Sequence, residues 1–335
     1  MIRQNVRRML FYAFCIAFLL LGTGTVLYAQ GWRFDVNTWS IKKVGGIFIK
    51  IYPRNASILL DGIPVQNASW LLQSGTFINN LFPRTYALTL RKEGFHPWTR
   101  HITVTPSFVA EVSNAVLVPR PVPEPSVASN ALPALVIPSL NAIIATSTRW
   151  SARAVNAHGS SSITLTETQG NNASSSSSPL TLALESPVRA LAWNNRSILG
   201  ILTKDGTLLQ HNPLEKEPKK VADDVVHFSW NSDGNKIAAL ERRSLEIFDL
   251  ENSANYYRFN IRGIGDAERL IWYRDNTHLF IVYPHTTVFF DFDDANIENI
   301  IEAAPTNRVS YDEDTNTLYF LEKTSGTLQA LTFPK

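Results

Sequence analysis

One short pattern dominates the second half of the chain: Trp230-Asn231-Ser232-Asp233-Gly234, and then the apolar run 237–240. The pattern recurs from Trp193, Trp272 and Tyr311, with aromatic-to-aromatic spacings of 37, 42 and 39 residues. In each copy a polar turn follows the aromatic residue, and two further strands follow the turn. A period near 40 residues predicts β-meanders that are repeated as the blades of a β-propeller.

A degenerate unit precedes these four copies. Residues 141–145 can be aligned with residues 235–239, and residues 152–155 would form its next strand. Four blades are few for a closed ring, so we expect four to five blades within residues 139–335. The alternative is a partial propeller that a partner chain closes. A Ser-rich stretch near residues 170–179 is predicted to be a disordered loop.

These units resemble the blades of WD40-like and TolB-like propellers, most closely over residues 230–237. Each blade exposes two apolar faces and needs neighbours on both sides, which explains the repetition. The resemblance implies a platform for protein binding. It also leaves open a TolB-like factor that assists assembly of the cell envelope.

The N-terminus predicts a membrane anchor. Residues 9–29 form a run of 21 residues without a charge, which is long enough to cross a bilayer as a helix. Arg3, Arg7 and Arg8 precede the run, so the positive-inside rule places the N-terminus in the cytoplasm. We therefore expect a single-pass plasma-membrane protein with residues 1–30 as its anchor. The alternative is a cleaved signal peptide.

The segment after the anchor is predicted to be a juxtamembrane stalk over residues 31–44. Tyr28, Trp32 and Trp39 would lie near the outer interface, where amphipathic aromatic rings concentrate. Beyond the stalk, residues 45–119 contain short alternating runs that predict a small antiparallel β-sandwich, with a turn at Asp61-Gly62. The expected strands are residues 47–52, 57–60, 86–90, 99–105 and 109–118.

Residues 45–119 resemble a PEGA domain. The matching positions are Pro53-Arg54-Asn55-Ala56, Asp61-Gly62, the run 81–86 and the run 94–98. Arg54 and Asn55 replace the family's Glu and Gly, and a further Gly of the family is replaced by Arg84. The resemblance implies a cell-surface module with a binding role.

A linker over residues 120–138 separates the two β regions, because alternating prolines favour an extended spacer. Residues 1–119 contain 12 Lys/Arg and 4 Asp/Glu, whereas residues 120–335 contain 19 and 25. The net charge of +2 gives no reason to expect a nucleic-acid partner. The only cysteine is Cys15, so no disulfide or thiolate site is available after the anchor.

Several groups of residues could be taken for ligand-binding sites, but the sequence does not favour such a role. Candidate ligands or stacking platforms are His96 with His101, Trp70 with Trp98, residues 312–316, and Asp291 with Asp293 and Asp294. Residues 312–316 have a calcium-loop spacing without the glycine and the closing glutamate, so a hairpin turn is expected there. The aspartates that follow a strand are expected to form a solvated strand end.

No local catalytic motif is present, so we predict no catalytic, metal-binding or cofactor-binding residues. We therefore predict a non-enzymatic, membrane-anchored extracytoplasmic scaffold of the cell envelope. Its expected partner is an envelope protein or a cell-wall polymer, and no small-molecule substrate is evident. An envelope hydrolase built on the propeller is the alternative, because the carboxylates of glycosidases leave no local motif.

Overall fold

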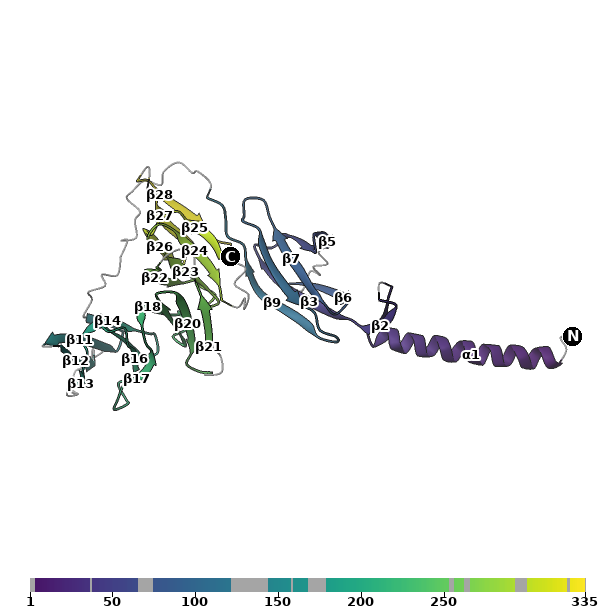
Figure 1. Ribbon diagram of the computed structural model, residues 1–335, viewed down its shortest axis with the longest axis horizontal. Coiled ribbons are helices and arrows are strands. Elements are labelled where there is room, and N and C mark those ends of the chain that lie inside the picture. Colours follow the sequence, from purple (N-terminus) through teal and green to yellow (C-terminus); the bar gives the residue numbers. More distant parts are fainter. Residues whose placement is uncertain are drawn as a thin grey trace. The chain divides into compact units, whose positions relative to one another are not determined.

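The computed structural model contains one helix followed by β-strands and divides into two compact units, residues 1–117 and 118–333 (Figure 1). The described residues are 4–36, 38–65, 75–121, 144–157, 159–167, 179–252, 256–261, 266–292, 300–323 and 326–334. Each unit has its own hydrophobic core, and they are described separately below.

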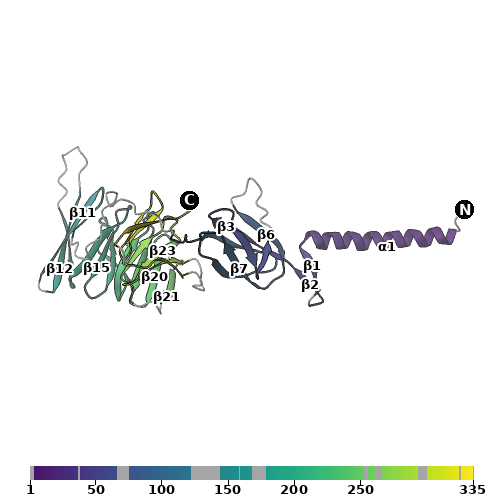
Figure 2. The same cartoon turned by 90° about the horizontal axis from the view of Figure 1, so that it is seen from above.

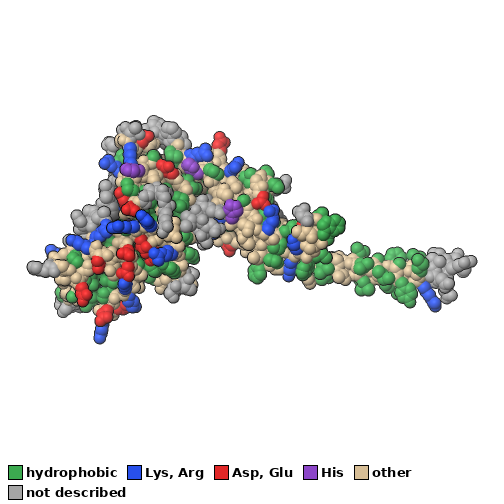
Figure 3. All heavy atoms as spheres, in the orientation of Figure 1, with side chains coloured by type: hydrophobic (Ala, Val, Ile, Leu, Met, Phe, Trp, Pro, Cys, Tyr) green, Lys and Arg blue, Asp and Glu red, His purple; other side chains and the backbone are tan. Residues whose placement is uncertain are grey.

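The helix α1 (Gln4–Ala29) begins the first unit. Its segment Arg7–Ala29 has 23 residues and a mean hydropathy of 2.1, so it is long and apolar enough to cross a membrane. Hydrophobic side chains are exposed along its length (Figure 3). The helix ends where Gly31 adopts a φ of +87° and its N–H donates to the Tyr28 carbonyl.

A β-hairpin follows the helix within the segment that the sequence assigns to a stalk (Figure 2). It pairs β1 (Trp32–Asp35) with β2 (Ser40–Lys43) in antiparallel register, with Phe34 opposite Ile41. The Val44 N–H donates to the Gly31 carbonyl at 2.9 Å and closes the base of the hairpin. These two strands are not predictable from local pattern, because each has only four residues.

Two sheets follow the hairpin and enclose the first core. One sheet has the order β6 (Thr76–Leu81), β3 (Gly45–Tyr52), β9 (Val109–Val116), and the other β5 (Ile63–Val65), β4 (Ser57–Leu60), β7 (Thr85–Arg91), β8 (Trp98–Thr103). All five expected strands are confirmed, as is the turn at Asp61-Gly62, where both residues have positive φ. The expectation of a purely antiparallel sandwich is wrong, because β3 and β9 run parallel.

The second unit contains five successive antiparallel meanders, four with four strands and the last with three. The first is β10 (Ile144–Thr146), β11 (Trp150–Ala157), β12 (Ser160–Glu167), β13 (Leu180–Leu184), and the second β14 (Val188–Trp193), β15 (Leu199–Thr203), β16 (Leu208–His211), β17 (Lys219–Ala222). The third is β18 (Val225–Trp230), β19 (Lys236–Glu241), β20 (Ser244–Asp249), β21 (Tyr256–Asn260). The fourth is β22 (Arg269–Trp272), β23 (His278–Val282), β24 (Thr287–Asp291), β25 (Ile300–Ala304), and the fifth β26 (Val309–Asp312), β27 (Thr317–Leu321), β28 (Leu328–Thr332).

These meanders have the strand order of propeller blades, and we call them blades one to five. Trp193, Trp230, Trp272 and Tyr311 all lie at or next to the end of the first strand of their blade, which confirms their expected equivalence. The degenerate unit is also confirmed as strands beside the blade of Trp193.

The expected alignment of the degenerate unit is off by one strand. Ala145 lies on the first strand of its blade, β10, whereas Ala239 lies on the second strand of its blade, β19. The short polar stretch before Trp150 is the first hairpin turn, so Ala145 corresponds to Ala192 on β14. Residues 141–143 and the Ser-rich residues 170–178 lie outside the described residues.

Among the described residues, the five blades form an open series rather than a closed ring (Figure 1). The side chains of blade one explain why one of its faces can be exposed to water. One face carries Ala152, Ile163 and Leu165, which are buried against blade two. The opposite face presents mostly polar side chains that are exposed, such as Arg153 and Ser162, together with the exposed Ile144 and Val155. A polar outer face is what repeat arrays use to end a stack of sheets.

Candidate functional site

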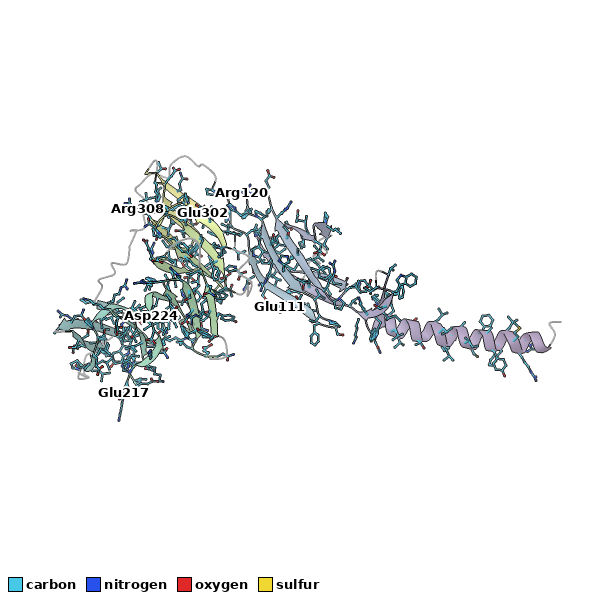
Figure 4. All side chains as sticks on the ribbon, in the orientation of Figure 1. Glu111, Arg120, Glu217, Asp224, Glu302 and Arg308 are labelled. Carbon is cyan, nitrogen blue, oxygen red and sulfur yellow. The ribbon has the colours of Figure 1, made fainter. Side chains whose placement is uncertain are left out.

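A shallow apolar groove lies on the outer face of the sheet β6-β3-β9. Phe77 on β6 is opposite Phe48 on β3, and Phe48 is opposite Glu111 on β9. Together with Val109 they line a cavity of about 360 Å³. Figure 4 labels Glu111. Because alternate residues of a strand face opposite sides, Ile47 and Ile49 fill the core while Phe48 faces outward.

Two glycines make room for the phenyl rings of the groove. A Cβ added to Gly46 would lie 2.9 Å from the Phe77 ring, and one added to Gly75 would lie 2.6 Å from the Phe48 ring. Each ring therefore occupies the space that a side chain would fill at these two positions. We define the groove as Phe48, Phe77, Val109 and Glu111. Its chemistry suits an apolar side chain next to a cationic or hydrogen-bonding group, because its single charge is a carboxylate.

The repeated tryptophans of the second unit fasten each blade to the one before it. The Trp193 indole N–H donates to the Ala145 carbonyl at 3.1 Å. Trp230 donates in the same way to Ala192 at 3.1 Å, and Trp272 donates to Ser229 at 3.0 Å. Each acceptor lies on the first strand of the preceding blade. We call these three contacts the indole clamps. Their role is structural.

The polar turns that follow the tryptophans join blades two, three and four. The buried Asn194 side chain donates to the Gly234 carbonyl at 2.8 Å, and Arg196 donates to the Asp233 carbonyl at 2.9 Å. Asn276 then donates to the Asp233 carboxylate at 2.8 Å. The Asp/Asn residues that mark the repeat are therefore engaged in contacts between blades, which we call the turn contacts.

The buried acid–histidine cluster of blade four is the arrangement that most resembles catalytic machinery. His278 is fully buried, its Nδ1 is 2.7 Å from Asp275, and its Nε2 is 3.7 Å from Asp291. Burial alone would raise the pKa of Asp275, but the charge and hydrogen bond of His278 and bonds from Thr277 lower it overall. The His278 ring stacks on Phe289 at 4.8 Å, which separates it from solvent. We interpret the cluster as internal packing.

The structure places three of the candidate residues named from the sequence in different surroundings. Trp98 is 1% exposed and belongs to the core of the first unit, and His101 lies exposed on β8. Asp291 is 4% exposed, so the expectation of a solvated strand end is wrong for this residue, because it faces His278. Trp70, Asp293 and Asp294 lie outside the described residues.

The calcium-like spacing at residues 312–316 is a hairpin turn, as expected. The Asp312 carboxylate accepts hydrogen bonds from the backbone of Asp314 and from the hydroxyl of Thr315. Asn316 is buried and donates to the Tyr273 hydroxyl and to the Phe333 carbonyl. Within the described part of the chain, no group of three or more His, Cys, Asp or Glu side chains is arranged to hold a metal ion.

Sequence reasoning missed the groove. Two features of the sequence indicate the groove. The first is the alternation around Ile47-Phe48-Ile49, which leaves one aromatic ring on the outer face. The second is the glycines at positions 46 and 75, which mark places where a ring or a backbone approaches closely. Because the sequence does not predict β6, Phe77 has no assigned partner there.

No family model and no curated protein matches the chain. Among solved structures it is similar to a chain of the mitotic checkpoint complex, with 11% identity over 79% of this chain and 83% of that one, at a TM-score of 0.42. The C-terminal WD40 domain of Sif2 matches at 12% identity over 56% and 55%, with a TM-score of 0.40. The WD40 domain of Toxoplasma gondii coronin matches at 15% over 58% and 70%, with a TM-score of 0.38.

The class of the protein follows from its strand order. Successive antiparallel meanders, joined blade to blade through their first strands, define a β-propeller-like architecture in the second unit. The first unit adds a β-sandwich and an apolar helix of membrane-spanning length.

Proposed function

We propose that the chain is a non-enzymatic binding scaffold of the cell envelope, anchored in the plasma membrane by α1 with its N-terminus in the cytoplasm. The sandwich is a PEGA-like module, and the blades form a five-bladed array outside the cytoplasm. The extracytoplasmic orientation is supported by the arginines that precede the helix, Arg7 and Arg8 among them.

The observation that carries this proposal is the way polar residues are used in the blades. His278, Asp275 and Asp291 are inside the blade, and the indole clamps and turn contacts occupy the repeated Trp, Asn and Asp residues. These groups serve packing. The apolar groove of the first unit, by contrast, faces outward. An open apolar groove is suited to holding a partner.

Photo-crosslinking in intact cells tests this scaffold role. A photoreactive amino acid placed at Phe77 in the full-length chain should give a specific adduct with an envelope protein or a wall polymer. The matched control is the same label at Leu214, which is 83% exposed on blade two. The adduct should disappear when Phe48→Glu is combined with the label. Equal adducts at both positions would contradict a binding role for the groove.

Two further measurements test the other parts of the proposal. Protease added outside cells stripped of their wall should degrade the region after the anchor, and full protection would overturn the orientation. Purified full-length protein should not turn over glycosidase, peptidase or esterase substrates. Turnover that a single carboxylate or serine substitution abolishes would establish an enzyme instead.

A further inference from the structure

The hairpin that follows α1 is amphipathic. Phe34, Val36, Trp39 and Ile41 are 52%, 68%, 80% and 60% exposed, and we call them the apolar face of the hairpin. Phe34 and Ile41 are a cross-strand pair, and the rings of Phe34 and Trp39 meet edge to face at 5.8 Å. Four adjoining large apolar side chains on so small an element need an occupant other than water.

The opposite face of the hairpin is polar and internally bonded. The buried Asp35 carboxylate accepts hydrogen bonds from Lys42 at 2.9 Å and from Thr38 at 2.7 Å. These bonds fix the strands in register, so the apolar side chains are held on one side. Trp39 itself has a φ of +48°, a backbone region that a bulky residue rarely occupies, and this conformation presents the indole at the tip.

Arg33 fastens the hairpin to the end of α1. Its guanidinium lies 3.6 Å from the centre of the Tyr28 ring and donates to the Tyr28 carbonyl at 2.6 Å. The same guanidinium donates to Asn80 on β6 at 3.1 Å. The Arg33 guanidinium therefore contacts the last turn of α1, the hairpin and the sandwich at once. The hairpin is held close to the point where α1 ends.

The lengths of these segments place the hairpin at a defined depth. The segment Arg7–Ala29 is about 34 Å long at 1.5 Å per residue, slightly more than the roughly 30 Å of a hydrocarbon core. Only Gln30 and Gly31 separate α1 from β1, which is about 7 Å of extended chain. The headgroup layer is about 5–8 Å thick on each side of the core. The hairpin thus begins within that layer.

We propose that the apolar face of the hairpin inserts into the outer interface of the bilayer and acts as a foot that supports the sandwich on the membrane. The occupant is the lipid interface, the region where tryptophan and tyrosine rings concentrate. Lys43, which is paired with Trp32 on the same side of the hairpin as Phe34 and Ile41, can contact lipid phosphates while the apolar side chains reach the acyl boundary. The inference rests on the proposed function, because it requires α1 to span the membrane.

Depth measurements on the full-length chain in phospholipid vesicles test the inference. In a Cys15→Ser background, single cysteines are introduced by Trp39→Cys, Leu20→Cys and Leu214→Cys and labelled with an environment-sensitive fluorophore. We expect the label at 39 to be quenched by lipids that carry a nitroxide near the headgroup, and shielded from aqueous iodide. The label at 20 should respond to nitroxides deep in the acyl chains, and the label at 214 only to iodide.

The three positions separate the two proposals. A label at 20 that responds to deep nitroxides, together with a label at 39 that is as accessible to iodide as the one at 214, overturns the foot alone. A label at 20 outside the bilayer overturns the anchor as well. Ile41→Cys repeats the measurement without removing the tip tryptophan. Shielding of 39 and 41 in detergent without any quenching by lipid nitroxides would indicate a protein contact, and would also overturn the foot.

Discussion

Blades one to four are joined to one another by one repeated contact, whereas blades four and five are joined in a different way. The indole clamps of Trp193, Trp230 and Trp272 each connect a blade to the first strand of the blade before it. Tyr311 occupies the equivalent position in blade five, but its hydroxyl donates to Asn316 within its own blade. Blade five thus keeps the aromatic ring of the repeat, but the polar group of that ring bonds to its own blade and not to the preceding one.

The interface between blades four and five relies instead on a cluster of aromatic rings in tilted and edge-to-face contact. Phe280 contacts Tyr311 and Phe333 with ring centres 5.2 and 5.5 Å apart, and Tyr273 contacts Tyr311 at 5.6 Å. Arg269 on β22 also donates to the Val309 carbonyl at 3.1 Å. A clamp fixes the register of two sheets through one directional bond, whereas a ring cluster provides buried area. Both solutions satisfy the same need to cover an apolar blade face.

The largest expected effect comes from removing a ring of this cluster. Phe280 is fully buried, so Phe280→Ala should lower the free energy of unfolding by about 3–5 kcal/mol. The measurement is denaturant unfolding of the full-length protein in detergent, followed by tryptophan fluorescence. Phe77→Ala, at an exposed ring, is the matched control and should have a far smaller effect on stability. Equal losses for both variants would mean that the cluster does not hold the interface.

A pH-dependent effect is expected at the interface between blades three and four. The His227 Nδ1 accepts the Leu270 backbone N–H at 3.3 Å. Burial, with the nearby charges of Arg269 and Arg189, lowers the pKa of His227 to about 4 from 6.5. The unfolded chain therefore takes up the proton first as pH falls. Stability should be full above about pH 6.5, fall between 6.5 and 4, and level off below, with a loss of about 3 kcal/mol.

The histidine can be isolated from other acid-sensitive groups by substitution. Burial also lowers the pKa of His211, so the total acid response has more than one source. His227→Gln retains an acceptor but cannot gain a proton in this range. The difference in unfolding free energy between this variant and the unmodified protein should vary between pH 6.5 and 4 and be constant outside that window. A constant difference throughout would show that His227 does not titrate between the folded and unfolded states.

A smaller effect is expected from an indole clamp. Trp230→Phe keeps a ring and removes the N–H that donates to the Ala192 carbonyl, which should cost about 1–2 kcal/mol. Trp193→Phe and Trp272→Phe should cost similar amounts, because the three bonds are 3.0–3.1 Å long and have equivalent acceptors. Unfolding of the three variants under one set of conditions checks this. Costs that differ severalfold would contradict equivalent clamps.

The sequence predicts the repeat and its aromatic positions because blade packing imposes a period that is visible in the linear order of the residues. The turn at Asp61-Gly62 is predictable for a local reason, since both residues tolerate positive φ. By contrast, the pairing of β3 with β9 connects residues about 60 positions apart in the chain, and nothing in either strand specifies a parallel neighbour.

The candidate surfaces are less predictable than the fold. The groove depends on Phe48 and Phe77 meeting across two strands, of which the sequence predicts only one. The burial of Asp291 depends on His278, which lies opposite it in the pairing of β24 with β23. Short strands and cross-strand contacts are determined by tertiary packing, which overrides local patterns. The same is true of the amphipathic hairpin, whose residues the sequence assigns to a stalk.

The smallest expected effect separates two kinds of polar contact among the turns. Arg196 forms an exposed ion pair with Glu251 and an exposed hydrogen bond to the Asp233 carbonyl, and water competes strongly for both contacts. Asn194 is 5% exposed and holds the turn through bonds to Gly234 and to the backbone of Ile198. Asn194→Ala should therefore lower the unfolding free energy by about 1–2 kcal/mol, since it leaves buried groups unpaired. Arg196→Ala should not measurably change the unfolding midpoint, at low or at high salt. If Arg196→Ala instead caused a salt-dependent loss equal to the loss from Asn194→Ala, surface charge would be what stabilises these turns. The hydrogen-bonded interfaces of blades one to four would then differ less clearly from the ring-packed interface of blade five.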